Sequence, residues 1–172
     1  MTIAQFREGS RLPVFHWSAV GAGLFVALGI HIVLTAFGLG VALLGKETVE
    51  EGNAAVGLLL WSGLAWIAAS FIGGYVTAWG SDSSRYVEGL FHGLVLWGAL
   101  TFVLMFLPPS TTMGVGATGS EPLLSANVIS SVAWFVAIGG VLSLGATIWG
   151  AVIGSRVVER VETKSADSYR AA

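Results

Sequence analysis

Residues 17–44 read WSAVGAGLFVALGIHIVLTAFGLGVALL and contain no Asp, Glu, Lys or Arg. A helix of about 20 apolar residues crosses the roughly 30 Å hydrocarbon core of a bilayer, so this stretch is long enough to span a membrane. Three further windows without charged residues follow it along the chain. We therefore predict four membrane-spanning helices, at residues 17–44, 54–79, 89–107 and 128–154.

The composition of the whole chain agrees with four spans. Of its 172 residues, 55% are hydrophobic and only 10% are charged, and the mean hydropathy is +0.81. Soluble domains carry about 25% charged residues, so a soluble enzyme, a nucleic-acid binder and a disordered tail are all excluded. Membrane β-strands are alternating segments of about ten residues, unlike these unbroken runs. The predicted fold is all-α: an integral membrane four-helix bundle built from two helical hairpins.

The basic residues predict how the chain is oriented. Seven of the eight Lys and Arg residues fall on one side of the predicted spans, and Lys46 alone falls on the other. Because basic residues near span ends stay in the cytoplasm, both termini are predicted to be cytoplasmic. The chain then divides into a cytoplasmic segment (1–16), a four-span domain (17–154) and a cytoplasmic helix or tail (155–172). The first span is too long for a cleaved signal peptide and is predicted to be a membrane anchor.

Small residues recur at helical spacing in every predicted span. Residues four apart share one helix face, and small side chains there allow close approach of two backbones in a membrane. Two interpretations follow: these faces pack inside one bundle, or some of them, most plausibly on the fourth span, dock against another protein. The predicted packing residues are Ala19, Gly23, Ala27, Ala65, Ala69, Gly73, Gly74, Gly89, Gly93, Ala146, Gly150 and Gly154.

Two histidines are candidate proton or ligand sites. His31 continues the small-residue stripe of the first span and falls near mid-membrane, where ionisable residues are often functional. His92 lies one helical turn after Glu88 near the start of the third span, so the carboxylate is predicted to favour a protonated imidazole. Both histidines also have a structural interpretation: His31 as a neutral hydrogen-bond donor to a neighbouring helix, and His92 as an anchor of a helix end.

No cofactor, metal site or catalytic motif is predicted. Three histidines, no cysteine and no intramembrane carboxylate are a poor ligand set for a metal ion. A haem held between His31 and His92 is disfavoured because their predicted depths differ by roughly 16 Å. A nucleophile elbow requires G-x-S-x-G, and the spacing around Ser143 does not match it.

Several short motifs carry a resemblance to a known group. The stretches 17–23 (WSAVGAG), 34–40 (LTAFGLG), 73–75 (GGY) and 88–97 (EGLFHGLVLW) resemble small, mostly proteobacterial four-span proteins labelled PhnA-like or hypothetical. The similarity covers about residues 17–107, and the fourth span matches loosely. The resemblance implies a location in the bacterial inner membrane. It implies no phosphonate chemistry, and the group has no established activity. It also draws attention to Gly73, Gly74, His92 and Trp97.

The function expected from the sequence is not enzymatic. Glycine- and alanine-rich helix faces predict a membrane scaffold or accessory subunit that forms a homo-oligomer or docks to a larger membrane complex, with the lipid bilayer as its surroundings and no nucleic-acid partner. The alternative is a small transporter or channel in which His31 and the Glu88/His92 pair line a path. Few polar residues interrupt the predicted spans, which disfavours this alternative.

Overall fold

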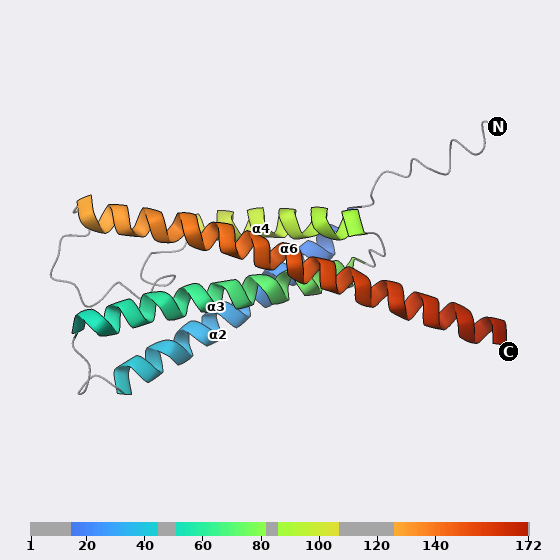
Figure 1. The fold of residues 1–172 in the computed structure, drawn as a ribbon, viewed down its shortest axis with the longest axis horizontal. Coiled ribbons are helices and arrows are strands. Elements are labelled where there is room, and N and C mark those ends of the chain that lie inside the picture. Colours follow the sequence, from blue (N-terminus) through green and yellow to red (C-terminus); the bar gives the residue numbers. More distant parts are fainter. Residues whose placement is uncertain (1–14, 45–50, 82–85, 107–125, 172) are drawn as a thin grey trace.

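The described part of the chain folds into a bundle of four helices. A computed structural model describes residues 15–44, 51–81, 86–106 and 126–171. The described elements are α2 (Trp17–Leu44), α3 (Glu51–Gly80), α4 (Tyr86–Phe106) and α6 (Ala126–Ala171), shown in Figure 1. The predicted all-α, four-helix fold is confirmed.

Successive helices alternate in direction. α2 begins, and α6 continues beyond the bundle, at the same end of the molecule (Figure 1). α3 is the central element, since it packs against α2, α4 and α6, and its contacts with α6 and α2 are the most extensive. These directions and contacts agree with two antiparallel hairpins, α2–α3 and α4–α6, which pack together mainly through α3.

The helix bounds differ from the predicted spans mainly at their ends. α2 matches residues 17–44, whereas α3, α4 and α6 each begin before the predicted positions. The predicted spans end at charged or turn-forming residues, but such residues do not stop a helix where it reaches water. Glu88, for example, lies in the first turn of α4, where a negative charge is favourable. Of the predicted connection 108–127, residues 108–125 lie outside the described part of the chain.

α6 is one continuous helix through the fourth predicted span and the predicted tail. Its 46 residues extend about 69 Å, more than twice the thickness of a hydrocarbon core. The C-terminal end of α6 therefore projects past the other helices, as Figure 1 shows.

Large apolar side chains point outward from the bundle and small ones point inward. Phe25 and Phe106 are 76% and 74% exposed, whereas the buried apolar residues are mostly alanines, together with Val20, Leu96, Leu100 and Val158. In water such an apolar exterior is unfavourable, while in lipid it is the expected surface. All four helices are long and apolar enough to cross a membrane.

Candidate functional site

The backbones of α3 and α6 approach each other closely at three glycines. A Cβ atom added to Gly74 would overlap the backbone of Thr147, and one added to Gly150 would overlap the backbone carbonyl of Phe71. A Cβ on Gly154 would come within 2.5 Å of a backbone oxygen on α3. Only glycine, which has no Cβ atom, allows the two backbones to come this close.

α2 meets α3 through a second set of small residues. A Cβ on Gly73 would lie 2.8 Å from Cβ of Ala27 and 2.9 Å from the carbonyl oxygen of Gly23, and one on Gly23 would overlap Thr77. The remaining predicted packing residues of these two helices are buried: Ala19, Ala65 and Ala69.

The contact between α4 and α6 is looser. A Cβ on Gly89 would lie 3.3 Å from Ser155, and one on Gly93 would lie 3.0 Å from Cβ of Ala151. Ala146 is half-buried. The small-residue faces predicted from the sequence thus lie between helices of this chain. In particular, the face of α6 that carries Gly150 and Gly154 is occupied by α3, and a partner cannot reach it while the bundle is closed.

His92 connects α4 to the start of α2. The backbone N–H of His16 donates to Nε2 of His92 at 3.2 Å, and Nδ1 of His92 lies 2.7 Å from the backbone oxygen of Glu88. Because Nε2 accepts, the proton is on Nδ1, which donates to Glu88. The carbonyl of His16 in turn accepts from Ala19 and Val20, so it begins the hydrogen-bond series of α2. His92 therefore caps the N-terminus of α2.

Aromatic stacking completes this contact. The Phe15 ring stacks on the His92 imidazole, with centroids 4.8 Å apart and planes within 4°, and His92 is only 1% exposed. Neither Phe15 nor the backbone of His16 has a role predicted from the sequence, because both precede the predicted first span. The predicted contact between the Glu88 carboxylate and the imidazole differs from the structure, in which the hydrogen bond goes to the Glu88 backbone.

This geometry predicts the effect of Glu88→Gln. The substitution leaves the backbone carbonyl in place, so we expect the imidazole ¹⁵N chemical shifts of His92 to be the same in the variant as in the wild type. Two-dimensional ¹H–¹⁵N spectra of the histidine-labelled protein in micelles measure this. A change in these chemical shifts would show that the Glu88 carboxylate, rather than the backbone carbonyl, is the partner of the ring.

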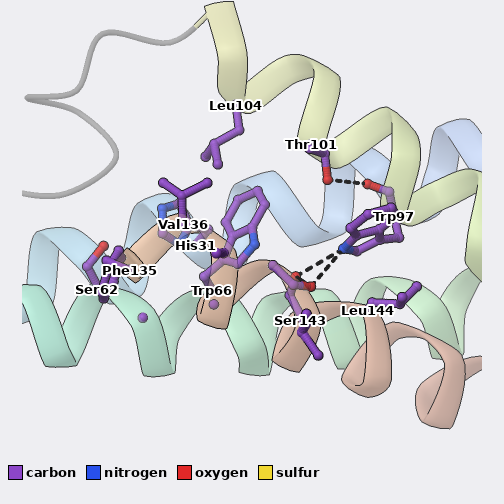
Figure 2. A pocket seen from close by; sticks show the side chains of 15 residues that line it. His31, Ser62, Trp66, Trp97, Thr101, Leu104, Phe135, Val136, Ser143 and Leu144 are labelled. Atoms are coloured by element: carbon purple, nitrogen blue, oxygen red, sulfur yellow. Dashed lines mark hydrogen bonds between the residues drawn. The ribbon is translucent and has the colours of Figure 1, made fainter. Parts of the chain in front are cut away.

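His31 lies at a cavity inside the bundle. The cavity has a volume of about 330 Å³ and is lined by residues from all four helices, including Trp66 of α3, Trp97 of α4 and Phe135 of α6 (Figure 2). The ring of His31 packs edge-on against Trp66, with centroids 4.9 Å apart. His31 is 4% exposed, and neither ring nitrogen has a hydrogen-bond partner within the described residues.

The other polar groups at the cavity include a small network between α4 and α6. Nε1 of Trp97 donates to the Gly140 carbonyl at 3.2 Å and to the Ser143 hydroxyl at 3.1 Å, and Ser143 itself donates to Gly140. Figure 2 shows these bonds beside the open space. From the sequence, Trp97 stands out only through the resemblance, and no role is predicted for Gly140 or Ser143. A cavity formed by side chains of four helices leaves no periodic pattern in the sequence of any one helix.

His31 and His92 belong to separate places in the bundle. His92 contacts the backbone of His16, which lies fifteen positions before His31 and so about 22 Å from it along the helix. Across the described residues, no group of three His, Cys, Asp or Glu side chains is arranged to hold a metal ion.

Comparison of the chain with protein families, curated proteins and solved structures found no match. The resemblance to the small proteobacterial proteins therefore stays a prediction.

Proposed function

We propose that this protein is a non-enzymatic scaffold or accessory subunit of the bacterial inner membrane, and that it assembles with a second copy of itself through the outward face of α2. The observation that supports this most is a set of small residues left on that face after the bundle has closed. Ala22, Gly29, Ala36 and Gly40 are all exposed. A Cβ on Gly29 or Gly40 would meet no atom within 4 Å. Small residues on a lipid-facing surface allow another helix to approach.

The same face also carries large apolar side chains, which project between the hollows left by the small residues. Phe25 and Ile32 are 76% and 66% exposed and alternate with Ala22, Gly29 and Ala36 at spacings of three and four residues. This is the spacing of helices that pack side by side. A face with both projections and hollows is self-complementary under two-fold symmetry, which favours a second copy as the occupant.

We propose further that both termini are cytoplasmic. Arg156, Arg160 and Lys164 are exposed on the part of α6 that projects past the bundle. Basic residues just outside a span favour the cytoplasmic side and attract anionic lipid headgroups. α6 would then extend into the cytoplasm as a helical arm.

A leucine substitution on the outward face of α2 tests this function. Gly29→Leu or Ala36→Leu should reduce self-association about ten-fold or more, because the added side chain holds the two α2 helices apart. Energy transfer between two fluorescently labelled populations reconstituted in liposomes measures the association. Ala68→Leu, an exposed small residue on α3, is the matched control and should have no effect.

Three outcomes would contradict the proposal in different ways. Equal energy transfer in all variants would exclude this face of α2. A loss in Ala68→Leu alone would move the contact to α3. If the wild-type protein is monomeric but copurifies with a stoichiometric membrane complex, the scaffold function would stand and the second copy would not.

A transporter or channel is the weaker alternative. Both ring nitrogens of His92 are engaged in backbone hydrogen bonds, and His31 lies about 22 Å along α2 from the His16 backbone that His92 contacts. The two candidate proton sites are therefore not joined by direct contact.

A further inference from the structure

His31 is the strongest sign of an unassigned ligand in this molecule. It lies near the middle of α2 with both ring nitrogens buried and without a hydrogen-bond partner among the described residues. A buried imidazole that makes no hydrogen bond is unfavourable, and native proteins rarely keep one without a functional reason. The contact with Trp66 engages the ring and leaves the nitrogens unpaired.

The space beside His31 has the size and walls of a small-molecule site. Its volume of about 330 Å³ falls within the range of ligand pockets, and its walls are mainly apolar. Trp66, Trp97 and Phe135 supply three aromatic side chains (Figure 2). Gly139 and Gly140 contribute bare backbone, and a Cβ on either would meet no atom within 4 Å.

We propose that this cavity binds an uncharged, planar, lipophilic molecule that carries one hydroxyl or carbonyl oxygen, and that His31 forms a hydrogen bond with that oxygen. A charged ligand is disfavoured at this depth because no opposite charge lines the cavity. Aromatic walls favour a flat ring. The χ2 torsion of histidine is soft, so a small rotation of the ring presents a nitrogen to the cavity.

Such a ligand can enter from the hydrocarbon phase. Thr101, Val136 and Val141 line the cavity and are also exposed, so the cavity opens toward the outside of the bundle between α4 and α6. A lipophilic molecule dissolved in the bilayer can reach His31 by this route without passing through water.

The test compares two probes that differ by one hydroxyl group, 2-naphthol and naphthalene. Radiolabelled probe retained by the full chain in lipid nanodiscs, beyond that retained by empty nanodiscs, gives the affinity. We expect 2-naphthol to bind about ten-fold more tightly than naphthalene, as one hydrogen bond to a buried group allows. His31→Leu should reduce this preference to less than about two-fold.

A second variant fills the cavity without disturbing the fold. Gly140→Leu places a side chain where no atom lies within 4 Å of the Cβ, and it should abolish retention of both probes. Gly145→Leu, on the same helix and also in open space, is the control and should bind as the wild type does. Helical content and the melting temperature of each variant show that the bundle is intact, so the result with Gly140→Leu decides the matter even if His31→Leu does not fold.

Any of three results would overturn the proposal. The first is that the wild-type chain retains no more probe than empty nanodiscs, and the second is that it retains both probes with equal affinity. The third is that folded Gly140→Leu binds 2-naphthol as tightly as the wild type. The dissociated variant Gly29→Leu should still bind 2-naphthol, because the cavity lies within one chain. This separates a failure of the ligand site from a failure of the assembly proposed above.

Discussion

Gly150→Ala should lower the free energy of unfolding by about 2 kcal/mol or more, the upper part of the range for overpacked interiors. The new methyl group would overlap the backbone carbonyl of Phe71, and a carbonyl held in a helix cannot rotate away as a side chain can. α3 and α6 would have to separate, and the contacts along their whole crossing would weaken. Reversible unfolding in mixed dodecyl maltoside and SDS micelles, followed by circular dichroism, measures the change.

Gly145→Ala is the matched control for this effect. It lies on the same helix five residues earlier, and a Cβ there would meet no atom within 4 Å. We expect no loss of stability, and a gain of up to about 1 kcal/mol from the higher helix propensity of alanine. Equal stability changes in the two variants would show that α6 does not pack against α3 through Gly150.

His92→Leu should lower the free energy of unfolding by about 2 kcal/mol. Leucine fills a similar volume but cannot accept the backbone N–H of His16, which would be left without its partner at the start of α2. Stacking on Phe15 would be lost as well. The same micelle titration measures this loss, and amide hydrogen exchange at Val20 should become faster because α2 begins less stably.

The control for His92→Leu is His16→Ala. The hydrogen bond to His92 uses the backbone of His16, whose own side chain is exposed and makes only a distant ring contact with His92, at 6.3 Å between centroids. The substitution should therefore change the stability by less than about 0.5 kcal/mol, as ordinary surface substitutions do. If His16→Ala destabilised the protein as much as His92→Leu, the imidazole of His16 and not its backbone would be the important partner.

The spans could be predicted because the bilayer fixes them physically. Charged residues are expensive in hydrocarbon, so the windows without charge show where the helices run, and 17–44 agrees with α2 at both ends. The ends of the other helices were less predictable, because a helix continues into water as readily as it stops at the interface. The 46-residue length of α6 is the clearest example.

The partners of each helix face were harder to predict, because lipid and protein interior are equally apolar. In α2, Gly23 packs against α3 while Gly29 meets open space, although each lies on a face that carries small residues at helical spacing. A soluble helix would mark its outward face with polar residues, whereas a membrane helix does not. The capping role of His92 was hidden for another reason: its two partners are backbone atoms, which carry no residue-type signal.

Cysteine crosslinking in native membranes tests the central claim most directly. The chain has no cysteine, so a single one reports on a single position. We predict that Gly29→Cys forms a disulfide-linked dimer under mild oxidation with copper phenanthroline, whereas Ala68→Cys, exposed on α3, stays monomeric. A Gly29→Cys protein that remains monomeric, or that crosslinks no faster than Ala68→Cys, would contradict assembly of two copies through the outward face of α2.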